Sequence, residues 1–251
     1  MFRKTVIPVS YLPSARQILD WGARLTRQLH SDLTVLYVSE TKQRGPLNLS
    51  VTNEKMSEWG VEPPSFKVLR EAEALIKAAG ALQLDAQGRG VERHAFKALS
   101  RELGEVHLKG PQGEDVRLRL REGPVVAEIL KEVADPGYDL VFIGTRGRRG
   151  LRRHLLGGIA HEVALNAPCS VLVAKTLDRA QAVLVGVTGR ASSTEAVRQG
   201  AALARSMGLP LRLLAIGARP EQRQAAQAHL DAARVLVEAQ GQTAEALLEA
   251  G

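Results

Sequence analysis

The sequence predicts an α/β fold, a doubly wound parallel sheet with helices on both faces. Along the first 175 residues, short apolar segments alternate with longer segments whose apolar residues recur every three or four positions. This alternation is typical of buried strands joined by amphipathic helices. A glycine-rich loop follows the apolar segment 140–143, and the opening pattern of the chain recurs from residue 182. The recurrence predicts a second α/β repeat.

Residues 1–177 are expected to form the first domain. Its expected strands are 5–9, 33–38, 116–120, 140–143 and 170–174, and its expected helices are 14–30, 64–82, 123–133 and 157–166. Ser14 is a suitable N-cap for the first helix, and Pro168 stops the last one. In such a sheet, ligands bind beyond the carboxyl ends of the strands, where the winding reverses.

The segment 91–121 gives two weaker expectations. The helical pattern that begins near Pro64 is interrupted around Gly90, and the sequence allows a helix to resume over 91–103. In the strand 116–120 and just beyond it, apolar residues alternate with Arg117, Arg119 and Arg121. Alternation places these arginines on one face of the strand, and we expect that face to be a solvated edge.

Residues 178–251 are expected to form a second, truncated copy of the same unit. Its segments in chain order are 182–187, 192–207, 210–216, 220–239 and 243–251. The first three mirror the opening strand, helix and strand of the chain, and the last is similar to 116–123. No counterpart of the glycine-rich loop follows, so this copy is not expected to hold a ligand site of its own.

The glycine-rich loop is the feature that points to a ligand. Gly144 ends an apolar strand, Gly147 follows three residues later, and a helix is expected to begin near Gly157. Glycines let the backbone approach a phosphate, and helix N-terminal N–H groups favour negative charge. Five arginines lie between Gly144 and Gly157, at positions 146, 148, 149, 152 and 153. The pattern therefore predicts a phosphate-bearing ligand.

Composition sets limits on the class of protein. The chain has 251 residues, of which 45% are hydrophobic, and a formal net charge of +7, which favours acidic ligands. No run of 18 apolar residues occurs, so no membrane span is expected. The chain begins directly with strand-like residues, and its single cysteine, Cys169, suits a reducing cytoplasm as a plain buried thiol. His154 and His161 have no third ligand beside them in the sequence, so no metal site is expected.

The region around the glycine loop resembles the universal stress protein family. Nucleotide-binding members carry Gly, two residues, Gly, nine residues, Gly, and then Ser or Thr; Gly144, Gly147 and Gly157 match both spacings. The flanks also match, with Asp139-Leu140 before the loop and the segment Ala167-Pro-Cys-Ser-Val-Leu-Val173 after it. The resemblance implies the adenine-nucleotide alpha-hydrolase-like fold, here as a tandem protein whose second copy is truncated.

The resemblance also implies a site for an adenine nucleotide, with ATP as the expected ligand, with or without Mg. The residues that match the family's binding positions, or lie beside them, are Pro8, Val9, Ser10, Val38, Gly144, Arg146, Gly147, Arg148, Gly157, Gly158 and Ile159. Two positions depart from the family pattern. Ser10 stands where binding members carry an aspartate, and Gly158 stands where they carry a hydroxyl residue.

The resemblance implies a stress-response or regulatory module and not a metabolic enzyme, although slow ATP hydrolysis stays open. We also expect a homodimer that pairs through the strand 170–174, because members of the family commonly pair their last strands. Two alternatives remain at this point. One is a nucleotide-free, dimerising scaffold that binds a protein partner, and the other, less favoured, is a binder of nucleic acid or a membrane surface driven by positive charge.

Overall fold

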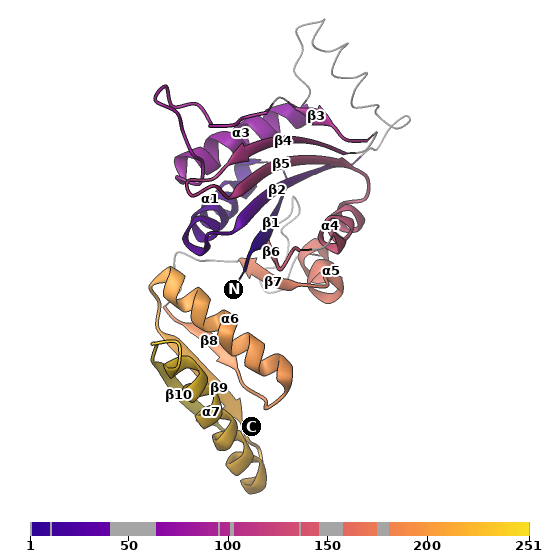
Figure 1. Cartoon of the computed structure of the whole chain (residues 1–251). Helices are drawn as coiled ribbons and strands as arrows, with labels where there is room; N and C mark the ends of the chain where they lie inside the picture. Colours follow the sequence, from indigo (N-terminus) through magenta and orange to yellow (C-terminus); the bar gives the residue numbers. More distant parts are fainter. Residues whose placement is uncertain are drawn as a thin grey trace, which may run out of the picture. The chain divides into compact units, whose positions relative to one another are not determined.

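The computed structural model describes residues 2–10, 12–40, 64–94, 96–100, 103–135, 137–145, 158–174 and 181–250. The chain divides into two compact units, residues 2–175 and residues 176–251. Figure 1 shows both units with their labelled elements. In the described part of the chain, no helix is long and apolar enough to cross a membrane.

A seven-stranded sheet forms the centre of the first unit, in the order β3-β4-β5-β2-β1-β6-β7. Its parallel strands are β1 (Lys4–Val9), β2 (Asp32–Ser39), β5 (Asp115–Glu122), β6 (Leu140–Gly144) and β7 (Ser170–Ala174). The chain first winds outward from β1 through β2 to β5 and then returns to β6, on the other side of β1. The reversal of winding therefore lies between β1 and β6, which confirms the doubly wound α/β prediction.

The first unit has an antiparallel extension where the sequence allowed a helix over 91–103, so that interpretation was wrong. The strand β3 (Lys97–Ala98) pairs with β4 (Leu103–Lys109), and β4 pairs with β5. Along β4, Gly104, Val106 and Leu108 are buried and the residues between them are half-buried. This period of two favours a strand, and pairing with β5 satisfies the backbone groups that a helix would otherwise bond internally.

The helices of the first unit cover the two faces of the sheet. On one face, α1 (Leu12–Leu29) and α3 (Pro64–Ala78) lie against each other, and on the other α4 (Val125–Ala134) lies against α5 (Gly158–Asn166) (Figure 1). The helix α1 approaches the sheet closely at Gly22, where a Cβ atom would lie 2.4 Å from Cδ1 of Ile7. A larger residue at 22 would therefore push the helix away from β1.

The second unit is a three-stranded parallel sheet in the order β10-β9-β8. Its elements are β8 (Val183–Gly186), α6 (Ala191–Met207), β9 (Leu211–Ile216), α7 (Pro220–Glu238) and β10 (Ala244–Glu249). Both helices pack on one face of the sheet, against a core that includes Val185, Leu213 and Ala201. The strand order repeats that of β1, β2 and β5 in the first unit.

The strand register is also the same in the two units. Leu33 of β2 lies opposite Thr5 of β1 and Val116 of β5. In the second unit, Leu211 of β9 lies opposite Val183 and Ala244 in the same way. The two sheets can therefore be compared residue by residue.

Candidate functional site

The strand register brings several residues named by the sequence to one edge of the first sheet. Val9 lies opposite Tyr37, which is followed by Val38. Val6 lies opposite Val141, and continuing this register places Val9 level with Gly144. The carboxyl ends of β1, β2 and β6 therefore meet at the reversal of winding, where an open α/β sheet binds its ligands.

The predicted residues at this edge differ in how far they are exposed to solvent. Val9 and Val38 are buried, Pro8 and Gly144 are half-buried, and Ser10, Gly158 and Ile159 are exposed. Arg146, Gly147, Arg148 and Gly157 lie outside the described residues. The described positions thus combine buried strand ends with an accessible hydroxyl at the end of β1.

The helix α5, which follows β6 in the chain, begins at Gly158, and its first turn contains no acidic residue. A Cβ atom added to Gly158 would have no atom within 4 Å, so the space beside this glycine is open. The first four N–H groups of a helix have no partner within it, and the helix dipole favours an anion there. The start of α5 therefore has the geometry and the electrostatics to receive a phosphate.

Gly144 has a packing role that the sequence did not reveal. A Cβ atom at this position would lie 2.9 Å from Cγ1 of Ile18 in α1. The absence of a side chain at 144 lets α1 lie close to the end of β6. Substitution of Gly144 would disturb this packing as well as any ligand, whereas substitution of Gly158 would disturb no packing.

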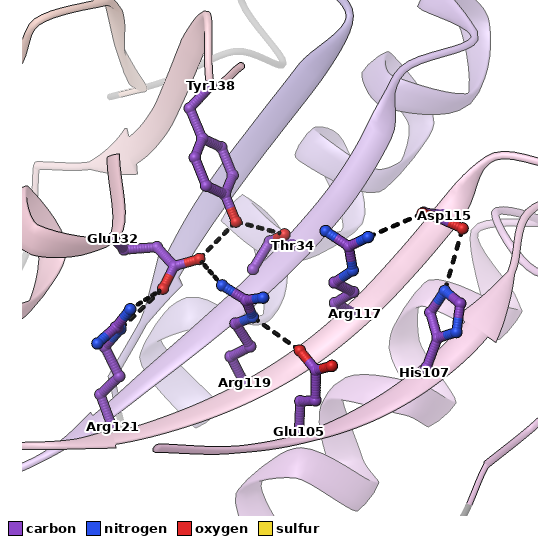
Figure 2. Close-up of polar contacts among 9 residues, drawn as sticks. All are labelled: Thr34, Glu105, His107, Asp115, Arg117, Arg119, Arg121, Glu132 and Tyr138. Atoms are coloured by element: carbon purple, nitrogen blue, oxygen red, sulfur yellow. Dashed lines mark hydrogen bonds and ion pairs between the residues drawn. The ribbon is translucent and has the colours of Figure 1, made fainter. Parts of the chain in front are cut away.

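A buried polar network lies beside this edge, on the sheet face under α4, and it corrects the prediction for the arginines of β5. Arg117, Arg119 and Arg121 do not form a solvated edge, because β5 lies between β4 and β2 inside the sheet. Of the three, Arg121 is only 5% exposed. Figure 2 shows these side chains with their acidic partners.

Glu132 of α4 is the centre of this network and is fully buried. Its carboxylate accepts hydrogen bonds from Arg119 and from Arg121, the latter at 2.7 Å. The hydroxyl of Tyr138 lies within hydrogen-bond distance of both Glu132 and Oγ1 of Thr34 (Figure 2). Burial tends to raise the pKa of Glu132, but the Tyr138 hydrogen bond and the two arginines hold that pKa below its ordinary value.

A second group of charges continues the network toward the amino ends of the strands. Asp115 lies 3.0 Å from Nε2 of His107, 2.9 Å from Nζ of Lys109 and 2.8 Å from Arg117. The hydrogen bonds from Lys109 and His107 outweigh burial and lower the pKa of Asp115. All four side chains are partly exposed, so this group contributes less to stability than the buried carboxylate of Glu132.

One signal in the sequence could have indicated this network. Glu128 and Glu132 are four residues apart and therefore lie on the same side of α4. The carboxylate of Glu128 also reaches Arg121, at 3.5 Å. An acidic helix face directly after an arginine-bearing strand predicts pairing across a β–α connection. In the described residues, no group of three or more His, Cys, Asp or Glu side chains could hold a metal ion.

Comparison with known proteins identifies relatives of this chain. The sequence of the universal stress protein YxiE of Bacillus subtilis is 22% identical over 175 residues, which are 70% of this chain and 100% of that protein. A universal stress protein of Methanocaldococcus jannaschii is 40% identical over 63 residues, 25% of this chain and 37% of the relative. The crystal structure of a universal stress protein from Archaeoglobus fulgidus has a TM-score of 0.63 at 17% identity, covering 99% of this chain and 78% of that one.

The similarity to the solved structure shows the fold of this chain, and a match to a family sequence pattern shows the family. The sequence pattern of the universal stress protein family matches residues 1–175, which include the strand ends at Val9, Val38 and Gly144 and the start of α5 at Gly158. This match spans the whole first unit and the open edge described above. The chain belongs to the universal stress protein family.

Proposed function

We propose that the first unit binds an adenine nucleotide, with ATP as the ligand, and acts as a nucleotide-responsive module in a stress response. The observation that carries the proposal is the carboxyl edge where β1, β2 and β6 end, together with the unobstructed start of α5, the helix that follows β6. Family membership supports it, since the glycine spacing of the nucleotide-binding members is present in this sequence.

The residues at this edge suit the two ends of a nucleotide. Pro8, Val9 and Val38 end their strands where the base would lie, with the backbone of Val38 next to it, and Ser10 offers one hydroxyl to the base or the ribose. Backbone N–H groups at Gly158 and Ile159 would face the phosphates. In the sequence, the remaining glycines of the motif and the arginines Arg146 and Arg148 lie next to this phosphate end.

Calorimetry with ATP and ADP tests the proposal directly. We expect one binding event per chain, because the glycine motif occurs once in the sequence. Mass spectrometry of small molecules released from the purified, denatured protein provides an independent readout. Absence of binding at millimolar nucleotide would favour the alternative of a nucleotide-free scaffold that binds a partner protein.

Restoring the two residues that depart from the family pattern is expected to tighten binding. Gly158→Ser adds a hydroxyl in open space at the phosphate end, and Ser10→Asp adds a carboxylate at an exposed position at the base end. Each should strengthen ATP binding by about 1 kcal/mol, the usual contribution of one added hydrogen bond. Gly158→Ala is the matched control, because it fills the same space without a hydroxyl. Unchanged affinity in both restored variants would mean that the nucleotide lies elsewhere.

We also predict a homodimer that pairs through β7. This strand ends the seven-stranded sheet, and no other described strand pairs with its outer edge. An open, apolar edge such as that of Val171 and Val173 tends to be covered, and two chains related by a two-fold axis would cover both edges at once. Light scattering should give twice the 27.1 kDa mass of one chain. A 27.1 kDa species that does not change on concentration would rule out this dimer.

A further inference from the structure

In the described part of the second unit, one face of the sheet carries no helix, and we call it the bare face. The helices α6 and α7 pack on the face that carries Val185 and Leu213. The opposite face carries four large apolar side chains, Leu184, Leu214, Ile216 and Leu247, which lie on alternate positions of the three strands. Leu184 is 56% exposed and Ile216 is 63% exposed. The same face also carries Arg212 and Glu245, which pair with each other. Large apolar side chains gathered on an exposed face mark an interaction surface.

The equivalent face of the first sheet is covered by helices. By the shared register, Leu184 corresponds to Val6, Leu214 to Leu36 and Ile216 to Val38. In the first unit these counterparts are at most 9% exposed, because they lie in the core that α4 and α5 cover. The described residues of the second unit include no helix on this face. The apolar pattern of a helix-covered face is thus present without its helix.

The face under α4 in the first unit and the equivalent face of the second unit carry different charges. This difference indicates which side chains a helix on the second unit would need. In the first unit, Glu128 and Glu132 of α4 pair with Arg119 and Arg121. The same register places Leu247 at the position of Arg119 and Glu249 at the position of Arg121. Glu132 pairs with both arginines, whereas Glu128 pairs with Arg121 and not with Arg119. A helix on the second unit would therefore place an apolar residue at the position of Glu132, against Leu247, and a cation at the position of Glu128, against Glu249.

Glu249 is the charge that a partner would meet. Its side chain is exposed and has no ion-pair partner among the described residues, whereas Glu245 on the same strand already pairs with Arg212 at 2.6 Å. A lysine or arginine on the incoming helix would neutralise it. The strands β8, β9 and β10 have 4, 6 and 6 residues, and only every second side chain lies on this face, which is fewer than the roughly 20–30 residues per partner of a stable protein–protein interface. A single short helix fits this area better than a second copy of the sheet.

We propose that this bare face is a docking surface for an amphipathic helix of a partner protein, laid across β8, β9 and β10 as α4 is laid across its own sheet. The helix would present an apolar stripe to Leu184, Leu214, Ile216 and Leu247 and a lysine or arginine to Glu249. This interaction is independent of nucleotide binding, because it uses only residues of the second unit.

A peptide derived from α4 tests the proposal on the full chain. The probe spans residues 123–135 with Glu128→Lys and Glu132→Leu, and a hydrocarbon staple joins positions 127 and 131, which are both exposed in α4. The staple is needed because a helix this short is marginal in water. Fluorescence anisotropy should show that the substituted peptide binds about tenfold or more tightly than the stapled peptide with the natural residues, which brings Glu128 against Glu249.

Two exposed residues provide a matched pair of protein variants. Ile216 on the bare face and Val235 on α7 are both 63% exposed. Ile216→Asp should weaken binding of the substituted peptide about tenfold or more, because a carboxylate would be buried without a partner, whereas Val235→Asp should leave binding unchanged. Leu184→Asp is a second variant of the face and decides the matter if Ile216→Asp does not fold by circular dichroism.

Three results would overturn the proposal. One is no binding of the substituted peptide to the full chain. Another is equal binding to wild type and to the folded face variants. The third is a doubling of mass in light scattering that Ile216→Asp abolishes, which would identify a second copy of this chain as the occupant.

Discussion

Replacing Glu132 with alanine is expected to lower the free energy of unfolding of the first unit by about 3–5 kcal/mol. The substitution removes a fully buried carboxylate and leaves Arg119 and Arg121 close together with fewer acidic partners. Tyr138 loses an acceptor at the same time. Urea unfolding followed by tryptophan fluorescence measures the effect, because both tryptophans, Trp21 and Trp59, belong to the first 175 residues.

The control for this prediction is Glu105→Ala. Glu105 pairs with the same arginine, Arg119, at 2.9 Å, but its side chain is 20% exposed. Water can solvate the arginine after this change, so we expect a loss of at most about 1 kcal/mol. Equal losses in the two variants would show that burial of Glu132 is not the source of its stability.

The same difference should depend on pH in a defined direction. Because the pKa of Glu132 is lower in the folded protein than in the unfolded chain, its contribution is present above the unfolded pKa. The contribution disappears as the pH falls through the folded pKa. Wild type and Glu132→Ala should therefore differ most near neutral pH and converge in acid.

Gly158→Asp is expected to weaken ATP binding about tenfold or more without destabilising the protein. The new side chain enters open space, so it displaces no neighbour. A carboxylate at the start of α5 interacts favourably with the helix dipole, which adds about 0.3–1 kcal/mol of stability. The same carboxylate occupies the N–H groups that a phosphate would use and repels the phosphate charge.

Gly158→Asn separates charge from size, because asparagine has nearly the same shape as aspartate without its charge. Calorimetry should show a much smaller loss of ATP affinity for Gly158→Asn than for Gly158→Asp, with similar unfolding curves for both. If Gly158→Asp binds ATP as the wild type does, the phosphates do not lie at the start of α5. That result would contradict the proposed site even if the protein still binds a nucleotide.

The candidate edge could be predicted because its signals are local. The apolar segment before Gly144, the glycine spacing after it and the helix that begins near residue 158 all lie within a short stretch of sequence. Parallel winding then brings the ends of β1 and β2 to the same edge. The packing of Ile18 against Gly144 was not predictable, since it depends on how closely α1 approaches β6.

The arginines of β5 illustrate a different kind of failure. A strand with alternating arginines has one charged face, and the alternation alone does not say whether that face meets water or protein. Pairing with β4 on one side and with β2 on the other places β5 inside the sheet. Burial of Arg121 then becomes favourable only because Glu128 and Glu132 lie opposite on α4.

By itself, the sequence predicted the parallel strands and their helices, although not β3 and β4, and it indicated the family, because periodicity, turn residues and motif spacing are properties of neighbouring positions. Tertiary structure alone decided which faces are covered. The equivalent apolar residues Val38 and Ile216 are alike in the sequence, yet one is 9% exposed and the other 63%. Burial depends on whether another element packs against a face, and such contacts join residues that are far apart along the chain.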